Sequence, residues 1–215
     1  MSENGFPSYK IILGSSSKAR REILTEMGYE YTILTADIDE KNIRMEKPEK
    51  LVVALAEAKA VAIMSRLQLS DFLEKDAEPT LLITADTVVV YEGAIREKPT
   101  DKEEARQFLK DYSGGLATVV GSVLVTNLKT GISKGGYDRV EVYFHDIPDE
   151  VIDNLIEEGI VLHVAGGLML EHPLIWPFVE TVMGTTDSVM GLSKALVKQL
   201  IFQSLVSSVP ADRLR

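Results

Sequence analysis

The 215-residue sequence contains no cysteine, one tryptophan and only three histidines. Without cysteine the protein forms no disulfide bond and no thiolate metal centre, although this does not identify the compartment. The histidines are too scattered along the chain to suggest a zinc site or a Ser-His-Asp triad; they are His145, His163 and His172. Acid–base chemistry in this protein therefore falls to carboxylates.

Long apolar runs are missing as well. The most apolar stretch, residues 51–64, contains Glu57 and Lys59 and is too short to span a bilayer. Residues 1–7 are polar and lack the basic and apolar regions of a secretory signal. We therefore expect a soluble, cytoplasmic protein that does not contact membranes.

Basic residues are outnumbered, with 23 Lys and Arg against 33 Asp and Glu, for a net charge of −10. This excess of negative charge argues against non-specific binding of nucleic acid or anionic membranes. The first 25 residues reverse the balance, because they carry four basic residues and two acidic ones. A locally basic segment in an acidic protein suits a small anionic ligand.

One acid, Asp86, interrupts an apolar run of strand-forming residues at 81–90. The run predicts a strand buried on both faces, where an ionised carboxylate is costly unless a metal, a cation or hydrogen-bond donors compensate it. Lys98 follows in a loop beyond the turn at 91–93. An acid and a nearby lysine are what a metal–phosphate site requires. On this segment alone, an Asp that merely caps a turn is the alternative.

A second candidate segment begins with a short strand at 10–13, which runs into a Gly/Ser loop and a helix. Such a loop points backbone N–H groups at whatever it binds, and Ser15 and Ser17 can add hydroxyl donors. Either Arg20 or Arg21 can grip phosphate oxygens in a bidentate manner. The spacing is not that of a Walker loop. The alternative is a serine N-cap followed by a solvated basic turn.

The rest of the chain alternates between strand and helix patterns, without repeats or a linker. Further strands are expected at 31–34, 116–127 and 137–144, and helices at 48–67, 101–112, 147–158 and 193–206. The buried stripe of the 48–67 helix is expected to include Leu51, Leu55 and Val61, with Lys59 beside it and reaching into a cleft. Trp176 and Phe178 are expected in the core.

These patterns predict an α/β fold, with a mixed sheet, flanking helices and two lobes around a central cleft. We expect one domain over residues 8–207. It lies between an N-terminal tail at 1–7 and a C-terminal tail at 208–215.

Short motifs over nearly the whole chain resemble those of the Maf family of nucleoside triphosphate pyrophosphatases. Residues 12–24, ILGSSSKARREIL, are similar to the family's opening SxSPRRxxLL pattern. Further elements match in the same order: Asp39-Glu40, the LAEAKA segment at 55–60, the TADTVV strand at 84–89 and Lys98-Pro99. Glycine-containing elements follow at 113–115, 165–167, 184 and 191–192. Several motifs in the right order are far more specific than any one alone.

The resemblance implies the fold shared by Maf and inosine triphosphate pyrophosphatases, and hydrolysis of a nucleoside triphosphate between its α- and β-phosphates. It implies Asp86 as the catalytic residue, and Glu40 with Asp86 as ligands of Mg²⁺ or Mn²⁺. Phosphate contacts would come from Ser15, Ser17, Arg20, Lys59 and Lys98. A homodimer and a role in removing modified nucleotides are also implied.

Three positions would then bear on the choice of base. Ala19 stands where the family has an arginine, and Thr87 agrees with the branch that acts on dTTP and UTP. Glu171 replaces that branch's glutamine and agrees with an acid in the 7-methyl-GTP branch. A carboxylate only accepts hydrogen bonds, so it suits the N1–H and N2–H₂ donors of guanine better than a pyrimidine edge. This favours a guanine-type base. A dTTP/UTP enzyme, or a rim Glu171 that never touches the base, is the alternative.

Two other classes of protein remain open from the sequence. A catalytically decayed nucleotide-binding regulator would retain the fold and bind triphosphates without turnover. An interaction protein would use the fold as a scaffold and present a partner surface, of which the sequence shows no conspicuous sign.

Overall fold

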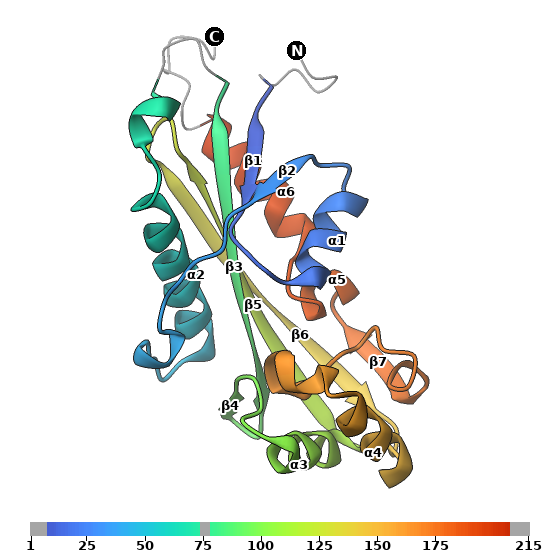
Figure 1. Cartoon of the computed structure of the whole chain (residues 1–215). Coiled ribbons are helices and arrows are strands. Elements are labelled where there is room, and N and C mark those ends of the chain that lie inside the picture. The colour runs from blue at the N-terminus through green and yellow to red at the C-terminus, as the bar shows by residue number, and fades with distance from the viewer. Residues whose placement is uncertain (1–7, 74–77, 207–215) are drawn as a thin grey trace.

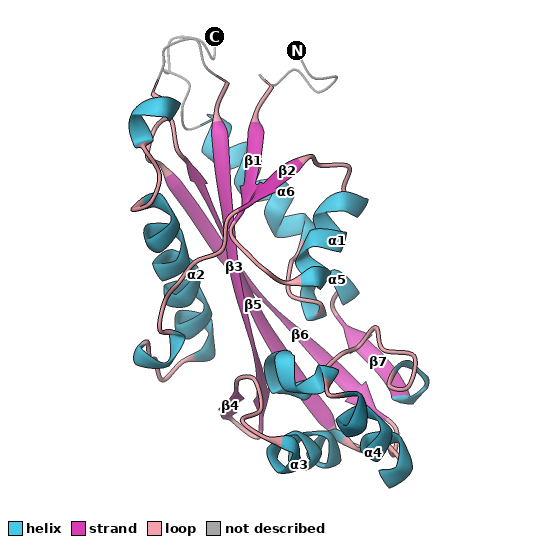
Figure 2. Ribbon diagram, viewed as in Figure 1, coloured by secondary structure: helices cyan, strands magenta, loops and turns pink. Residues whose placement is uncertain are grey.

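A seven-stranded mixed sheet runs through the whole computed structural model, which describes residues 8–73 and 78–206 (Figures 1 and 2). Both predicted tails, 1–7 and 208–215, lie outside the described residues. The strand order is β2-β1-β3-β5-β6-β7, with β4 paired to β3 off this path. The strands are β1 (Lys10–Leu13), β2 (Tyr31–Ile33), β3 (Thr80–Tyr91), β4 (Ala94–Arg96), β5 (Leu116–Asn127), β6 (Ser133–Phe144) and β7 (Val179–Met183).

Six α-helices flank the sheet in the described part of the chain, together with short 3₁₀ turns. The helices are α1 (Lys18–Glu26), α2 (Pro48–Met64), α3 (Lys102–Tyr112), α4 (Asp149–Glu158), α5 (Thr186–Val189) and α6 (Lys194–Val206). The 3₁₀ turns are η1 (Glu40–Asn42), η2 (Leu69–Phe72), η3 (Ile160–His163), η4 (Ala165–Gly167) and η5 (Trp176–Phe178). The predicted α/β class and mixed sheet are confirmed.

Strand β3 has helices on both faces, so its apolar residues are buried on both sides. Leu81, Ile83 and Ala85 pack with α1 and α6, whereas Leu82 and Val88 pack with α2. Because side chains alternate along a strand, Asp86 points to the α2 face and Thr87 to the α1 face. The two helices therefore reach this stretch of β3 from opposite sides.

The molecule has two lobes joined by the long strands β3, β5 and β6 (Figure 1). Helices α1, α2 and α6 flank one end of the sheet, and α3, α4 and β4 gather at the other. A separate apolar core fills this second lobe. It is formed by α3, α4, the C-terminal ends of β3 and β6 and the N-terminal end of β5. The predicted two-lobed architecture is confirmed.

One edge of β3 is covered at both ends but not between them. Parallel pairing with β1 extends as far as Ile83, and antiparallel pairing with β4 begins at Val89. Among the described strands, residues 84–88 pair only with β5 on the opposite edge. This gap contains Asp86, and it marks the boundary between the lobes.

Two expectations about burial are wrong. Val61 is 62% exposed, because α2 turns toward the sheet the face that carries Val52, Ala56 and Ile63. This helix has apolar residues on most of its surface, so its sequence did not reveal which side faces inward. Trp176 is 54% exposed in the turn η5, although Phe178 packs against the second lobe's core.

Candidate active site

A lysine and two carboxylates converge at the gap in the β3 edge. Lys59 Nζ lies 2.5 Å from Asp86 Oδ1 and 2.9 Å from Glu40 Oε1. The Lys59 and Asp86 side chains are only 12% and 10% exposed, and Glu40 is 40% exposed. Lys59 lies on the inward face of α2, between Ala56 and Ile63, so its stem crosses apolar surface before its ammonium reaches the carboxylates. The structure thus brings together three residues predicted from separate motifs.

Arg20 occupies the opposite face of the same strand and bonds mainly to protein. Its Nε donates to the Gly191 carbonyl at 2.8 Å, and Nη1 donates to the Ala85 carbonyl at 3.1 Å. Nη1 also donates to Ser15 Oγ at 3.3 Å, and Nη2 donates to Thr87 Oγ1 at 3.1 Å. These four hydrogen bonds use four of the five N–H donors of the guanidinium. Arg20 therefore ties together the Ser15 loop, β3 and the turn between α5 and α6.

The loop between β1 and α1 is held close against β3. Gly14 N donates to the Ile83 carbonyl at 2.7 Å, and a Cβ at Gly14 would lie 2.6 Å from Thr84 Cγ2. Only glycine fits this close approach. Ser15 Oγ accepts from Ser17 N at 3.2 Å, and Ser17 caps α1 by accepting from Arg20 N at 3.4 Å. The predicted strand–loop–helix unit is confirmed, with both serine side chains in the loop.

Charges in this region depend on one another. Burial raises the pKa of Glu40, but the Lys59 hydrogen bond and charge, with the charges of Lys98 and Arg20, lower it below its ordinary value of 4.5. Burial lowers the pKa of Arg20, against the raising effect of Asp86 and Glu40. Arginine stays protonated at neutral pH even so. The cluster therefore combines three cations with two carboxylates, an arrangement suited to an anionic ligand.

Lys98 belongs to the wall of the site that the second lobe provides. It is exposed in the turn after β4, close enough to Glu40 for its charge to lower the pKa of that carboxyl. The turn is anchored by Gly166 N, which donates to the Glu97 carbonyl at 2.8 Å. Across the gap, Arg44 Nη1 lies 3.4 Å from Glu97 Oε2. This pair joins the two lobes at the mouth of the site, and no motif in the sequence pointed to it.

The three residues predicted to select the base are separated in space. Thr87 follows Asp86 in β3 but points to the α1 face, where its hydroxyl accepts from Arg20. Ala19 is half-buried in the first turn of α1. Glu171 is exposed beyond η4, and within the described residues no hydrogen bond or ion pair links it to the Lys59 cluster. Its segment is nevertheless anchored, through Gly166, to the turn that carries Lys98.

Glu40 and Asp86 could share one divalent cation, provided that its other ligands come from elsewhere. No group of three or more His, Asp or Glu side chains in the described parts of the chain could hold a metal by itself. The Lys59 ammonium shows, however, that a single cation can contact Glu40 and Asp86 together. Mg²⁺ commonly uses one or two carboxylates and takes its remaining ligands from phosphates and water. The donor set therefore suits a metal that arrives with a phosphorylated ligand.

None of the helices in the described residues is long and apolar enough to cross a bilayer.

Comparison with known proteins agrees with the motifs. The family model for Maf-like proteins matches residues 10–204. A 7-methyl-GTP pyrophosphatase from Dictyostelium discoideum is 39% identical over 91% of this chain and 98% of its own length. A dTTP/UTP pyrophosphatase from Alkaliphilus metalliredigens is 32% identical over 85% of this chain and 90% of its own length. A nucleoside triphosphate pyrophosphatase from Salinispora tropica is 28% identical over 89% of this chain and 82% of its own length. The family match over most of the chain and these identities show that the chain belongs to the Maf family.

Proposed function

We propose that this protein hydrolyses a nucleoside triphosphate between the α- and β-phosphates, releasing a nucleoside monophosphate and pyrophosphate. The observation that carries the proposal is the convergence of Glu40 and Asp86 on Lys59 Nζ, at the open edge of β3. The names of the similar proteins support the same reaction, and so does the cationic surround of these carboxylates.

Asp86 is the proposed catalytic base. Its Oδ1 is held by Lys59, whereas Oδ2 has no hydrogen-bond partner in the described residues and can accept a proton from water. In-line attack by that water breaks the bond between the α-phosphorus and the bridging oxygen, and pyrophosphate leaves. No covalent enzyme intermediate is required.

Charge stabilisation is divided among the surrounding residues. Lys59 and Lys98 contact phosphate oxygens from the two sides of the gap, and Ser15 and Ser17 add hydroxyl groups at the loop. Arg20 contributes its charge and one remaining N–H donor. Glu40 and Asp86 would hold Mg²⁺ or Mn²⁺, which supplies neutralisation of the phosphate charge when bound.

The preferred base is proposed to be guanine-type, with 7-methyl-GTP as the first candidate. Glu171 is exposed and acceptor-only, which matches the donor edge of guanine. The 39% identity to a 7-methyl-GTP pyrophosphatase supports this choice. The competing candidate is dTTP or UTP, favoured by Thr87 and by the second group of relatives.

Pyrophosphate release from the purified protein tests the reaction. Assays with Mg²⁺ or Mn²⁺ would compare 7-methyl-GTP, GTP, ITP, CTP, UTP and dTTP. We expect turnover that depends on Asp86, with guanine-type triphosphates preferred. Nucleotide binding without turnover on any triphosphate would contradict the proposal and favour a decayed regulator.

The preferred base is tested further by Glu171→Gln. If Glu171 accepts hydrogen bonds from guanine donors, this variant lowers kcat/KM for 7-methyl-GTP. The ratio of kcat/KM for 7-methyl-GTP to that for UTP then falls. An unchanged ratio would place Glu171 at the rim, without contact to the base. Removal of modified nucleotides in the cytoplasm and a homodimeric state complete the proposal, and they rest on the family resemblance. Light scattering during gel filtration measures the oligomeric state.

A further inference from the structure

Two consecutive arginines in α1 have opposite environments. Arg20 directs four of its N–H donors to protein acceptors, so it cannot present a free two-pronged fork to a phosphate. The Arg21 guanidinium has no hydrogen bond or ion pair with any described residue, and its Nε is buried without a partner. A buried donor of this kind calls for a ligand or water that completes its bonding.

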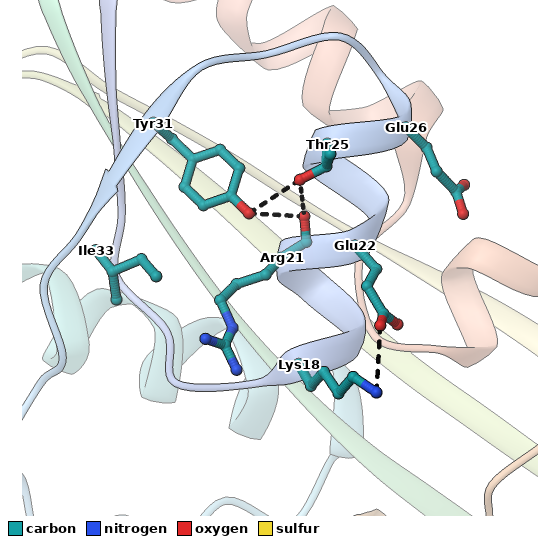
Figure 3. Close-up of a pocket in the computed structure, with 7 residues that line it drawn as sticks. All are labelled: Lys18, Arg21, Glu22, Thr25, Glu26, Tyr31 and Ile33. Atoms are coloured by element: carbon teal, nitrogen blue, oxygen red, sulfur yellow. Dashed lines mark hydrogen bonds and ion pairs between the residues drawn. The ribbon is translucent and has the colours of Figure 1, made fainter.

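Arg21 projects into a surface cavity of about 590 Å³ between α1 and β2 (Figure 3). The cavity is lined by Lys18, Arg21, Glu22, Thr25, Glu26, Tyr31 and Ile33. The backbone of Arg21 is fixed there, because the Tyr31 hydroxyl donates to the Arg21 carbonyl at 2.9 Å. The helical turn is thus held in place, while the guanidinium contacts no hydrogen-bond partner among the residues that the structure describes.

The charge left over in the cavity is positive. Both acidic residues of its lining have cationic partners: Glu22 lies 3.5 Å from Lys18 Nζ, and Glu26 lies 2.8 Å from Lys194 Nζ. Arg21 is consequently the cation that no described carboxylate compensates. An anion with several oxygen atoms is the chemical class that such a guanidinium binds best.

The cavity lies at the same end of the sheet as the Ser15 loop and Glu40. Strands β1 and β2 are parallel and in register, with Leu13 opposite Ile33, so their carboxyl ends meet at one edge. Ser15 follows the first of these ends, and the chain leaves the second toward Glu40. Crevices outside the carboxyl ends of parallel strands are the usual ligand sites of such sheets. Since the pairing of β1 with β3 also stops at Leu13 and Ile83, the Ser15 loop starts at the same edge of the sheet as the gap that contains Asp86.

We infer that Arg21, rather than Arg20, supplies the bidentate contact to the pyrophosphate end of the substrate, and that Lys18 assists it. This inference rests on the proposed function, since that reaction makes pyrophosphate the leaving group. Arg20 acts as a positioning residue that orients Ser15 and Thr87. The cavity between α1 and β2 is then the subsite for the β- and γ-phosphates.

Product inhibition tests the assignment, because the two products occupy different ends of the site. In Arg21→Gln, we expect the inhibition constant of pyrophosphate to rise about tenfold or more, as for the loss of a charge-assisted hydrogen bond. The inhibition constant of the nucleoside monophosphate should stay unchanged. Lys102→Gln, which removes the same charge at the exposed start of α3, is the control and should alter neither constant.

Thermal unfolding separates the two arginines. Arg21→Gln should keep the melting temperature of the wild type, because its guanidinium has no partner to lose among residues 8–73 and 78–206. Arg20→Gln should lower it, since the carbonyls of Ala85 and Gly191 lose their donor. Equal melting temperatures for the two variants would contradict the division of roles.

Calorimetric titration of pyrophosphate with Mg²⁺ needs no turnover, so it separates failure of this inference from failure of the proposed function. Weaker pyrophosphate binding by Arg21→Gln than by the wild type supports the inference, even if no triphosphate is hydrolysed. Equal binding by the two proteins, or no binding by the wild type, overturns it. An equal rise in the inhibition constants of pyrophosphate and of the nucleoside monophosphate in Arg21→Gln would also overturn it.

Discussion

At the scale of single residues, the site depends on a charged group placed inside a buried strand. The whole Asp86 residue is 7% exposed, between residues that pack against helices on both faces, and Lys59 Nζ at 2.5 Å from its Oδ1 compensates its charge. Lys59 is in turn shared with Glu40 at 2.9 Å. Asp86 and Lys59 therefore compensate each other's buried charge, since an unpaired buried charge is costly, and the half-exposed Glu40 gives Lys59 a second carboxylate partner.

Replacement of Asp86 by Asn should remove nearly all turnover while the fold is kept. The amide has nearly the same shape but cannot accept a proton, so we expect kcat to fall by about 10²–10⁴, the usual range for loss of a general base. Steady-state kinetics and circular dichroism measure the two properties. Asp37→Asn, at an exposed loop position, is the matched control. Retained turnover in Asp86→Asn would remove Asp86 from the catalytic role.

The lowered pKa of Glu40 makes a prediction about stability and pH. A carboxyl whose pKa is lower in the folded state stabilises the protein above its unfolded pKa, and this contribution is lost as pH falls through the folded value. Wild type should therefore exceed Glu40→Gln in melting temperature above about pH 5, with a difference that shrinks at more acidic pH. The difference should be small, because the side chain is 40% exposed. A difference that grows on acidification would contradict the assignment.

At the scale of elements, the site is assembled where separate segments touch. The turn that carries Lys98 is anchored by η4, and η4 packs so tightly that a Cβ on Gly166 would lie 2.5 Å from Val89 Cβ. Gly166 also has φ +60°, a left-handed conformation that favours glycine. The Tyr112 hydroxyl, which donates to the Gly166 carbonyl at 2.9 Å, completes the anchor.

Gly166→Ala should destabilise the protein by about 1–3 kcal/mol or more, as overpacking does in well-packed regions. The loss should appear as a lower midpoint in chemical denaturation. Gly131→Ala is the matched control, because Gly131 also has a positive φ of +72° but has no neighbouring atom within 4 Å of its Cβ. The free energy of unfolding of the control should fall less, because only backbone strain lowers it. Equal losses for the two variants would show that the packing at Gly166 adds nothing.

The Arg44–Glu97 pair predicts an effect on substrate affinity. Arg44 belongs to the segment after Glu40, and Glu97 precedes Lys98, so the pair sets the spacing between the two walls. Reversal of either charge should raise KM about two- to fivefold, as expected for an exposed pair worth up to ~1 kcal/mol.

The double reversal, Arg44→Glu with Glu97→Arg, should restore KM toward the wild-type value. The same set of variants in the Arg139–Glu49 pair, 3.2 Å apart, provides the control because that pair lies outside the proposed site. Failure of the double reversal to recover KM would show that the single effects do not arise from this contact.

At the scale of the whole molecule, the two lobes have separate cores and meet at the uncovered stretch of β3. Ligand contacts from Lys59 on one lobe and Lys98 on the other would couple the lobes. A ligand that binds only the folded state stabilises it by RT ln(1 + [L]/Kd).

An α,β-methylene triphosphate with Mg²⁺, at about a hundred times its Kd, should therefore add about 2.7 kcal/mol of stability. For a chain of this length that corresponds to roughly 5–11 °C in melting temperature. Differential scanning fluorimetry measures the shift, and a Lys59→Met, Lys98→Met double variant should lose most of it. An absent shift in a wild-type protein that hydrolyses the parent triphosphate would contradict binding between the lobes.

Much of this architecture could be predicted from the sequence, because local patterns carry it. The apolar run around Asp86 predicted a strand buried on both faces, and its boundaries agree with β3 within a residue or so. The strand–loop–helix unit and the position of Lys59 near a buried stripe were also local signals, as was the alternative of a serine N-cap, which Ser17 provides. Each depends on residues that are neighbours along the chain.

What the tertiary structure alone decided are the contacts between segments distant in sequence. The sequence could not tell which side of the largely apolar α2 faces the sheet, so Val61 was expected inside. Nor did it distinguish Arg20, which bonds to Ala85 and Gly191, from Arg21 beside it, whose guanidinium has no partner in the described part of the chain. Side-chain type and spacing determine which elements form. The partner that a given charge meets depends on how those elements pack, since its energy comes from atoms far away along the chain.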